Sequence, residues 1–594
     1  MAEVRDEWRA RVARALNILK NNKAIDASEI QADLITAETP PDPAMGDIGF
    51  PMFAFARIFR MAPPAIAAEM VSVLESDPDA AAAGTMKQVG PYVNVFLAKG
   101  NMATQVLAEI TAAGESFGRS KMLSGKRIMV EFSSPNTNKP LHLGHLRNDA
   151  LGESISRILK FCGAEVFKVN IINNRGVHIC KSMLAYQKFG NGATPESTGI
   201  KSDHFVGDWY VRFNTYSKEN PETAEAEAQA MLRAWEAGDP DVLKLWKQMN
   251  DWTVSGISET YARTGVSFDK LYYESDTYLK GKDEILAGLD KGLFYRETDG
   301  SVWVDLSPIN LDKKVLLRKD GTALYMTQDI GTAIYRHSDW PFNQLVYVVG
   351  CEQQYHFKVL FYVLEKLGYD WAHDLYHLSY GMVNLPEGKM KSREGTVVDA
   401  DDLIDHLRDG AREEIAEKGR DEAVGDPEET AEKIALGALH YYLLQATPTK
   451  DMLFNPKESL SFNGNTGPYL QYMGARISSI LRKVESEAAT GNDLLAGSTL
   501  KPELLTDEAE WSLLKTLADY PKQVERAAET RDPSFITAYL YEVSRGFSRF
   551  YHDCPILTAC SPDLIRTRLE LVRAVRVVLK SAMELILVPF LETM

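Results

Sequence analysis

Cysteine is scarce in this sequence, and long uncharged apolar runs are missing. Only five cysteines occur in 594 residues, an odd number with no Cys-x-x-Cys pair, which argues against a disulfide framework and against a structural zinc site. The simplest interpretation is a reducing compartment, the cytoplasm. The most apolar stretch, residues 569–590, contains Arg573, Arg576, Lys580 and Glu584, so it predicts a packed amphipathic helix rather than a membrane span.

An excess of basic residues is also missing. The chain has 83 Asp and Glu against 66 Lys and Arg, a formal net charge of −17, which is unfavourable for broad phosphate binding. A large acidic protein can nevertheless carry a local basic track. Much of the acidity lies in residues 399–432, where solvated helix faces are the simplest explanation. Repeats and low-complexity tracts do not occur, so a solenoid is not expected.

What the sequence does contain predicts several packed domains. With 594 residues, of which 45% are hydrophobic, two to four cores are expected. Residues 1–112 alternate helical stretches with short β-like runs, and residues 88–97 are predicted as one half-buried strand. Residues 125–399 show strand and helix alternation, with a polar, helix-rich insertion at about 191–265. Residues 400–594 are patterned almost entirely as helices, enough for a bundle domain.

The middle region predicts a doubly wound parallel sheet. Short apolar runs typical of buried strands occur at 128–132, 165–172, 345–349 and 376–380. Helical periodicity follows the first two, over 146–161 and from about 177. Strand–helix–strand–helix at this spacing is typical of an α/β, Rossmann-type domain, whose ligands bind at the carboxyl edge of the sheet.

The most informative segment is Val130-Glu-Phe-Ser-Ser-Pro-Asn-Thr-Asn-Lys-Pro-Leu-His-Leu-Gly-His-Leu-Arg147. A strand enters a proline-containing loop, and His142 to His145 open a helix, whose free N–H groups and partial positive charge favour a phosphate. His142 and His145 are three residues apart and can point at the same anion. Gly144 has no Cβ, so an adenine ring can approach the backbone closely. A zinc-binding pair of histidines is the alternative, although no Cys or third His cluster completes such a site.

This segment resembles the HIGH signature of class I aminoacyl-tRNA synthetases, and Gly388-Lys-Met-Lys-Ser-Arg-Glu-Gly395 is similar to their KMSKS loop. The second match is imperfect, because Lys391 stands where Ser is usual and Ser392 where the second Lys is usual. Arginyl-tRNA synthetases often lack the second lysine of this loop, and a lysine just ahead of the histidine motif takes over its role. Lys139 occupies that position in this sequence. The resemblance therefore implies that the catalytic residues are Lys139, His142 and His145, and that ATP is bound by His142, Gly144, His145, His356, Lys389, Met390 and Lys391. Which lysine of the loop contacts phosphate stays open.

Five polar residues match the arginine pocket of that family. A guanidinium substrate requires carboxylates for forked hydrogen bonds. Glu131 and Asn136 flank the turn after the first strand, Gln353 follows a later strand, and Asp329 lies four residues after Tyr325, on one helix face. The resemblance implies that Asp329 and Tyr325 hold the guanidinium, with Asn136, Glu131 and Gln353 around the remaining groups. Taken singly, each is more simply explained as a solvated polar residue, so the assignment depends on all five matches together.

Both flanking regions resemble tRNA-binding domains of arginyl-tRNA synthetases. The first resembles the domain that grips the tRNA elbow, through Gly46-Asp-Ile-Gly49 and Gly90-Pro-Tyr-Val-Asn94; Tyr92 would stack on a base and Asn94 would read its edge. The last resembles a helical anticodon-binding domain, through residues 464–472 and 550–556. There the implied tRNA contacts are Tyr469, Tyr472, Arg476 and Met594. For each tyrosine, a core position is the alternative.

The resemblance as a whole implies ATP-dependent ligation of L-arginine to tRNA(Arg) through arginyl-adenylate. Mg²⁺ is expected to be held mainly by ATP phosphates, without a protein metal site. A monomer in the cytoplasm that does not bind membranes is the further expectation. Two alternatives remain open. One is another ligase or nucleotidyltransferase with the same histidine signature, against which the helical third region speaks. The other is a catalytically inactive relative that binds tRNA.

Overall fold

The computed structural model describes residues 2–386, 398–417, 419–420, 424–491 and 493–594. Lys389, Met390 and Lys391, three of the predicted ATP contacts, lie outside the described residues. The chain forms two compact units. One comprises the residues up to Gly118 with 473–523 and 539–581, and the other comprises 119–472 with 524–538 and 582–594. Among the described residues, no helix is both long and apolar enough to cross a bilayer.

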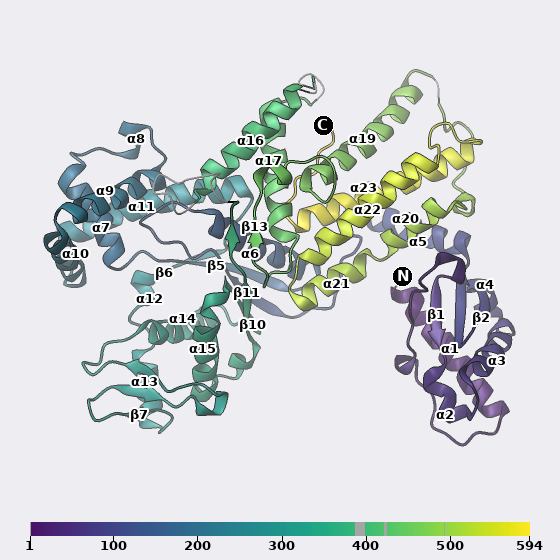
Figure 1. Ribbon diagram of the computed structural model, residues 1–594, viewed down its shortest axis with the longest axis horizontal. Helices are drawn as coiled ribbons and strands as arrows, with labels where there is room; N and C mark the ends of the chain where they lie inside the picture. Colours follow the sequence, from purple (N-terminus) through teal and green to yellow (C-terminus); the bar gives the residue numbers. More distant parts are fainter. Residues whose placement is uncertain (1, 387–397, 418, 421–423, 492) are drawn as a thin grey trace. The chain divides into compact units, whose positions relative to one another are not determined.

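A five-stranded parallel sheet forms the centre of the second unit (Figure 1). Its order is β11-β10-β4-β5-β6, and every neighbouring pair is parallel. The strands are β4 Arg127–Glu131, β5 Glu165–Ile172, β6 Lys270–Tyr273, β10 Gln344–Gly350 and β11 Leu375–Tyr380. The predicted doubly wound fold is confirmed, and the four predicted strands lie within one residue of their expected ends. Strand β6 was not predicted.

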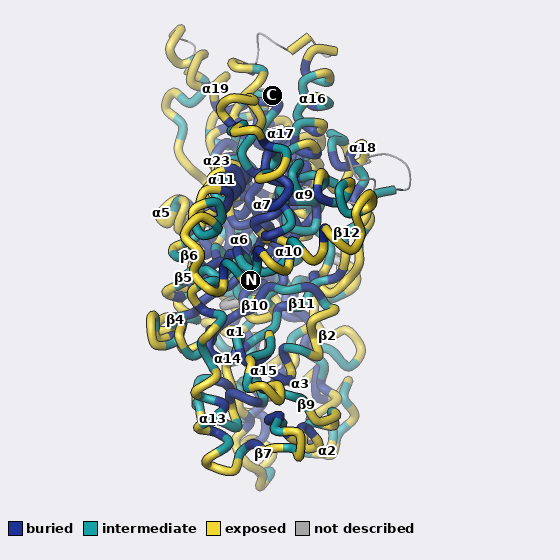
Figure 2. Tube along the Cα trace, turned by 90° about the vertical axis from the view of Figure 1, so that its left-hand side faces the viewer, coloured by how far each residue is buried: buried dark blue, intermediate teal, exposed yellow. Residues whose placement is uncertain are grey.

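Helices cover both faces of this sheet, so its central strands β4 and β10 are mostly buried and apolar. On one face lies α6 (Leu143–Phe161), whose residues are almost all buried (Figure 2). It approaches β4 closely at Gly152, where a Cβ would collide with the Phe132 ring. On the other face lie α14 (Tyr325–Asp339) and α15 (Gln354–Leu367), which share a core with Met129, Val169 and Leu345 of the strands.

The region between β5 and β6 is helical, as its pattern predicts. The helices are α7 Val177–Phe189, α8 Pro195–Thr198, α9 Ser202–Glu219, α10 Pro221–Glu236 and α11 Pro240–Thr264. Helices α7, α9, α10 and α11 lie together as one group (Figure 1) and have a hydrophobic core of their own that includes Phe205, Phe213 and Met249. This insertion therefore folds around its own apolar side chains rather than as an extended linker.

A small antiparallel sheet between β6 and α14 was not predicted. It has the order β7-β8-β9, with β7 Tyr295–Arg296, β8 Val302–Val304 and β9 Lys314–Leu317. The short helices α12 Glu274–Thr277 and α13 Lys282–Asp290 precede it. Its strands have two to four residues, too few for a clear period-2 pattern.

The N-terminal region packs α1 Ala2–Asn22, α2 Ala56–Phe59, α3 Pro63–Glu75, α4 Pro78–Ala83 and α5 Lys99–Ala113 around a three-stranded antiparallel sheet. The sheet order is β1-β3-β2, with β1 Ile48–Pro51, β2 Gly84–Val89 and β3 Tyr92–Leu97. The prediction of a single strand over 88–97 is wrong. Gly90 has a φ of +58° and is followed by Pro91, which has no N–H, so the chain reverses there into a hairpin.

The remaining elements are α-helices, as predicted for the last third of the chain, apart from a two-stranded ribbon of β12 Val383–Asn384 and β13 Met452–Leu453. The helices are α16 Ala400–Glu417, α17 Pro427–Leu444, α18 Pro456–Ser459, α19 Gly467–Ala489, α20 Glu508–Ala518, α21 Tyr520–Thr530, α22 Ser534–Asp553 and α23 Pro562–Leu585. Helices α17 and α19 touch at Gly467, where a Cβ would collide with the Gly437 carbonyl oxygen. The Thr-Gly-Pro start of α19 thus has a packing reason.

Candidate functional site

The carboxyl edge of the parallel sheet gathers most of the predicted catalytic residues. Strand β4 ends at Glu131 and continues into the loop of residues 132–141, after which His142 is the N-cap of α6. Strand β10 ends at Gly350 and is followed by Gln353 and α15. Helix α14 runs from this edge to the opposite one, because Asp339 at its far end bonds Lys270, the first residue of β6. Tyr325 and Asp329 at its start therefore lie near the strand ends.

The two signature histidines form a reciprocal cap on α6. The backbone N–H of Gly144 donates to His142 Nδ1 at 3.1 Å, and the backbone N–H of His142 donates to His145 Nδ1, also at 3.1 Å. The two ring centroids lie 3.9 Å apart. Because each Nδ1 is an acceptor, the proton of each neutral ring is on Nε2. The pair thus presents two N–H donors at a helix N-terminus, the arrangement that suits an anion.

Electrostatics keep both imidazoles neutral. Burial, and then the nearby Lys139 ammonium, lower the pKa of His142 to about 4. The pKa of His145 is lowered further, by burial and by His142 and Lys139. These shifts place Lys139 within electrostatic reach of both rings. Gly144 has a different neighbour than expected, since a Cβ there would lie 3.0 Å from the His142 ring. The fit of the cap therefore already requires a small residue.

The predicted arginine residues fall into two groups. Asp329 and His356 face each other from α14 and α15, with His356 Nε2 2.6 Å from Asp329 Oδ2. Tyr325, at the start of α14, is 76% exposed and can reach a bound molecule. His356 therefore lies beside Asp329, the residue expected to bind the guanidinium group. The contact of His356 with ATP stays a prediction.

Glu131 is buried and forms an ion pair with Arg336 of α14. Arg336 is itself buried, with its guanidinium over the Tyr272 ring. One carboxylate oxygen of Glu131 is thus already paired with Arg336. The sequence alone could not show this ion pair, because the two residues are far apart in the chain. Asn136 and Gln353, by contrast, are exposed at the sheet edge.

Sequence reasoning missed one carboxylate at this edge, Glu274. It directly follows β6 and is half-buried. Burial raises the pKa of its carboxyl group, Arg175 opposes that shift, and the charge of Asp329 raises it further. The two carboxylates therefore act on one another, and a cation between them would be favoured. The sequence did contain a signal for it: the short, mostly apolar run Lys270-Leu-Tyr-Tyr273 is followed directly by Glu274.

A second buried acid lies on α6. Asp149 is 2% exposed, and neither of its carboxylate oxygens has a hydrogen-bond partner among the described residues. Burial raises its pKa to about 8, and the Ser133 hydroxyl offsets only part of the shift. The Ser133 hydroxyl oxygen also lies 2.6 Å from the Tyr261 hydroxyl oxygen. Asp149 is therefore a neutral acid at pH 7.

Replacing Asp149 with asparagine is expected to stabilise the protein, and more so at high pH. The pKa of about 8 lies above the unfolded value, so the folded state keeps a proton that the unfolded chain releases between about pH 4 and pH 8. Wild-type stability therefore falls across this window, and asparagine removes that loss. We expect the variant to melt on the order of 5 °C higher at pH 8 and about equally at pH 4. Thermal unfolding at both pH values measures this, with the exposed Asp402→Asn as control. Parallel shifts at the two pH values would contradict the assignment.

The predicted N-terminal tRNA residues differ in accessibility. Tyr92 is half-buried and packs edge-on against Phe53, with 5.9 Å between the ring centroids, and Phe53 is 57% exposed. Asn94 is buried, and its amide donates to the Met45 carbonyl oxygen at 2.8 Å. Phe53, which sequence reasoning did not select, is thus the more exposed aromatic side chain. Asn94 holds the loop beside it.

Two of the predicted anticodon residues line one cavity. Tyr472 of α19 and Met594 border a space of about 280 Å³, together with Glu414, Ile415, Arg420, Ile434, Phe462 and Asn463. Arg420 donates to the Met594 carbonyl oxygen at 2.8 Å. Tyr469, Tyr472 and Arg476 are half-buried on one side of α19. Apolar walls with a few polar groups suit a nucleobase.

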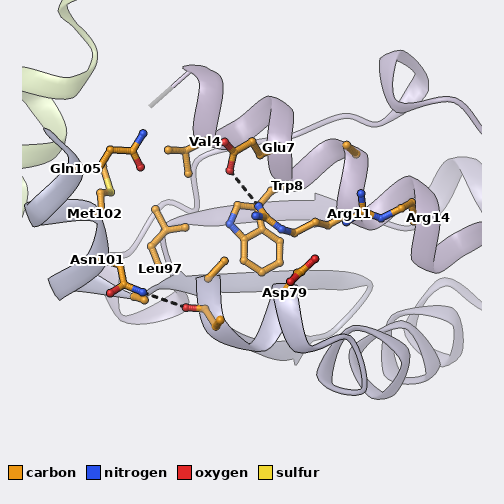
Figure 3. Close-up of a pocket in the computed structure, with 14 residues that line it drawn as sticks. Val4, Glu7, Trp8, Arg11, Arg14, Asp79, Leu97, Asn101, Met102 and Gln105 are labelled. Carbon is orange, nitrogen blue, oxygen red and sulfur yellow. Dashed lines mark hydrogen bonds and ion pairs between the residues drawn. The ribbon is translucent and has the colours of Figure 1, made fainter. Parts of the chain in front are cut away.

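A cavity of about 540 Å³ in the N-terminal region lies away from these residues (Figure 3). It lies beside Trp8 and Leu97, with Arg11 and Glu7 on one wall. The guanidinium of Arg11 donates to Glu7 at 3.3 Å and stacks near Trp8. The Arg11 and Glu7 charges that line the cavity thus balance one another, and the cavity indicates no particular ligand.

Comparisons with known proteins agree with this geometry. Residues 107–456 match the family model for the tRNA synthetases class I (R) catalytic domain, 470–594 the DALR anticodon binding domain, and 6–97 the arginyl tRNA synthetase N terminal domain. The arginine–tRNA ligases of Treponema denticola and Treponema pallidum are 65% and 59% identical to the chain, each over 100% of both sequences. The structure of Thermus thermophilus arginyl-tRNA synthetase superposes with a TM-score of 0.79 at 27% identity, covering 99% of this chain and 100% of that one.

Proposed function

We propose a division of labour among the residues of this site on one premise: the chain belongs to the arginyl-tRNA synthetase family and is an arginine–tRNA ligase. It joins L-arginine to tRNA(Arg) at the expense of ATP. The intermediate is arginyl-adenylate, and the products are arginyl-tRNA, AMP and pyrophosphate.

In the activation step, the phosphates of ATP lie over the N-terminus of α6. The arginine carboxylate attacks the α-phosphorus, the bond to the β-phosphate breaks, and pyrophosphate leaves. His142 and His145 donate from Nε2 to the phosphate oxygens, and the Lys139 ammonium offsets the charge that develops there. The observation that carries this assignment is the fixed acceptor role of both Nδ1 atoms. The protein thereby has its donors in position before the substrate arrives.

Arginine is recognised by charge at one end and by polar groups at the other. Asp329 and Glu274 bind the guanidinium, with the Tyr325 hydroxyl completing the set. The second carboxylate oxygen of Glu131, together with Asn136 and Gln353, binds the α-ammonium and carboxylate groups. Support comes from the coupling of the Glu274 and Asp329 carboxylates, which a bound cation relieves.

Magnesium enters with ATP as part of the substrate. The region of His142, His145 and Lys139 supplies cationic and N–H groups, which match phosphate rather than a metal ion. Among the described residues, one group has metal-ligand spacing, namely Asp203, His204 and Asp401. The Lys201 ammonium already lies 3.1 Å from Asp203 and 2.7 Å from Asp401. These residues therefore do not fit a resident metal.

The regions 1–112 and 400–594, which precede and follow the catalytic region 125–399 in the sequence, bind tRNA. Phe53 and Tyr92 stack on an exposed base at the elbow, and the cavity beside Tyr472 and Met594 takes an anticodon base, with Tyr469 and Arg476 alongside. The 2′-OH of the terminal adenosine then attacks the adenylate carbonyl. A monomer that works in the cytoplasm and activates arginine only with tRNA bound completes the proposal.

ATP–pyrophosphate exchange tests this proposal directly. We would measure it with each standard amino acid, with and without bulk tRNA. Exchange with arginine alone, and only in the presence of tRNA, supports the substrate assignment and the tRNA requirement together. Exchange with another amino acid would overturn the roles of Asp329 and Tyr325. Exchange without tRNA would overturn the requirement alone.

Replacing Tyr472 with alanine is expected to raise KM for tRNA about 10-fold, because a stacked base loses on the order of 1–3 kcal/mol. The KM for arginine and the rate of pyrophosphate exchange at saturating tRNA should not change. Steady-state aminoacylation measures both, with Tyr295→Ala, an exposed tyrosine of β7, as the matched control. An unchanged KM for tRNA would mean that Tyr472 only packs.

A further inference from the structure

The loop that carries Asn136 and Lys139 begins with strained backbone. Ser133 and Ser134 are consecutive non-glycine residues with φ of +75° and +53°. Such conformations are unfavourable for residues with a Cβ and persist only where surrounding contacts enforce them. What enforces them therefore also determines where Asn136 and Lys139 lie.

Two buried asparagines hold the start of the loop from within the catalytic core. The side-chain oxygen of Asn148, on α6, accepts the Ser133 N–H at 2.6 Å, and that of Asn170, on β5, accepts the Ser134 N–H at 3.0 Å. These bonds fix the backbone only as far as Ser134. Asn173, which follows β5, adds backbone bonds to Pro135 and Thr137. Further support reaches the loop from a second direction.

That support comes from the helical insertion. Tyr261 of α11 has its hydroxyl 2.6 Å from Ser133 Oγ. Because Asn170 donates to the Tyr261 oxygen at 3.1 Å, the hydroxyl proton is available for Ser133. Burial raises the pKa of Tyr261 well above its usual range, so its hydroxyl stays protonated at any working pH. About two turns earlier on α11, the Thr253 hydroxyl lies 3.1 Å from the Thr137 carbonyl oxygen and 3.0 Å from the Met249 carbonyl oxygen of its own helix.

A third contact lies at the end of the loop. Gly207 of α9 packs against Pro140, and a Cβ there would come within 2.8 Å of the proline Cδ and 3.7 Å of the Lys139 Cα. Three separate points of the insertion thus meet the loop at residues 133, 137 and 140. The hydroxyls of Thr253 and Tyr261 are buried, so their bonds are shielded from water.

We propose that the helical insertion positions the catalytic loop, and that Tyr261 and Thr253 are positioning residues for arginine activation. This inference rests on the proposed roles of Lys139 and Asn136. The Tyr261 and Thr253 hydroxyl groups of the insertion fix the loop backbone beside the residues that contact the substrate. A displacement of about 1 Å at such a position lowers the rate as much as 10²-fold.

The test is the double variant Tyr261→Phe/Thr253→Val, which removes both hydroxyls and almost no volume. We expect kcat for arginine-dependent pyrophosphate exchange to fall about 30-fold, with KM for tRNA unchanged, because Lys139 acts mainly in the transition state. Thr253→Ser, combined with the native Tyr261, should retain activity close to the wild type. Rescue by serine distinguishes a hydroxyl bond from packing.

Two controls match the chemistry. Thr264→Val removes a buried hydroxyl of α11 that bonds only carbonyls of its own helix. Tyr186→Phe removes a hydroxyl that bonds Ala193 within the insertion. Both should keep wild-type kcat. If they lower kcat as much as the double variant does, the effect is general stability and the proposal is wrong.

Lys139→Met separates this inference from the proposed function. A large loss of kcat in Lys139→Met with wild-type kcat in the double variant would overturn the positioning role alone. Wild-type kcat in Lys139→Met would overturn the proposed role of the lysine itself. Losses in both, with active controls and unchanged thermal unfolding, are the expected result.

Discussion

Asp329→Asn is expected to lower kcat/KM for arginine about 10³-fold, since a carboxylate that the bound guanidinium covers contributes on the order of 4 kcal/mol. Asparagine keeps the shape of the side chain but offers one acceptor and no charge. The effect should appear mainly in KM for arginine, because the guanidinium is bound equally in the ground state and in the transition state. Pyrophosphate exchange at saturating ATP and tRNA measures it, and KM for ATP should stay within about 3-fold of wild type.

A matched control lies on the same helix. Asp339 ends α14 and bonds Lys270 and Tyr272, at the opposite edge of the sheet. Asp339→Asn should leave the KM for arginine unchanged. Glu274→Gln, by contrast, should raise this KM by about 10-fold, because the half-buried glutamate supplies the second charge. If Asp329→Asn retained wild-type kcat/KM, the pocket would have to lie elsewhere.

The sequence predicted the parts of this site that depend on local order. The strand that ends at Glu131, the proline-containing loop and the helix opened by His142 are consecutive in the chain. Hydrophobic periodicity and helix-capping chemistry act over the same few residues. The parallel sheet followed from strand–helix alternation, because a crossover helix forces neighbouring strands to run in the same direction.

Contacts between distant segments were beyond that reasoning. Asp329 and His356 are 27 positions apart, and Glu131 and Arg336 are 205 positions apart. Each pair depends on how two helices are placed on the sheet, which residue spacing does not report. Glu274 was missed for a related reason. Its strand has four residues, and the partner that makes it noteworthy, Asp329, comes from another helix.

The N-terminal hairpin shows the converse error. Alternation over 88–97 was interpreted as one strand, although Gly90 and Pro91 both disfavour a continuous ladder. Gly90 and Pro91 were therefore a better guide to the local structure than the hydrophobic pattern. Asp47, in the same region, bonds the Leu97 N–H at 3.0 Å and the Trp511 indole at 3.0 Å. The Gly-Asp-Ile-Gly segment therefore has a structural role that its composition did not indicate.

His142→Asn/His145→Asn is expected to reduce kcat for pyrophosphate exchange at least about 10⁴-fold, because two preorganised donors to the developing phosphate charge are removed. Asparagine is a good N-cap, and its short side chain can still accept the backbone N–H that Nδ1 accepts now. Its amide does not reach the position of Nε2. The variant should therefore fold and bind tRNA with wild-type affinity while it loses catalysis.

Glutamine at the same two positions should have the opposite effect, because it keeps a hydrogen-bond donor and loses the helix cap. Its longer side chain can place an amide N–H near the position of Nε2, but it no longer caps α6 at the Nδ1 position. His142→Gln/His145→Gln should thus retain more of kcat than the asparagine pair and unfold at a lower temperature, by on the order of 1–2 kcal/mol of stability. Comparing the two variants in exchange and in thermal unfolding separates the donor from the cap. If asparagine retained the greater share of kcat, the catalytic contribution would lie in the helix cap rather than in the Nε2 donors.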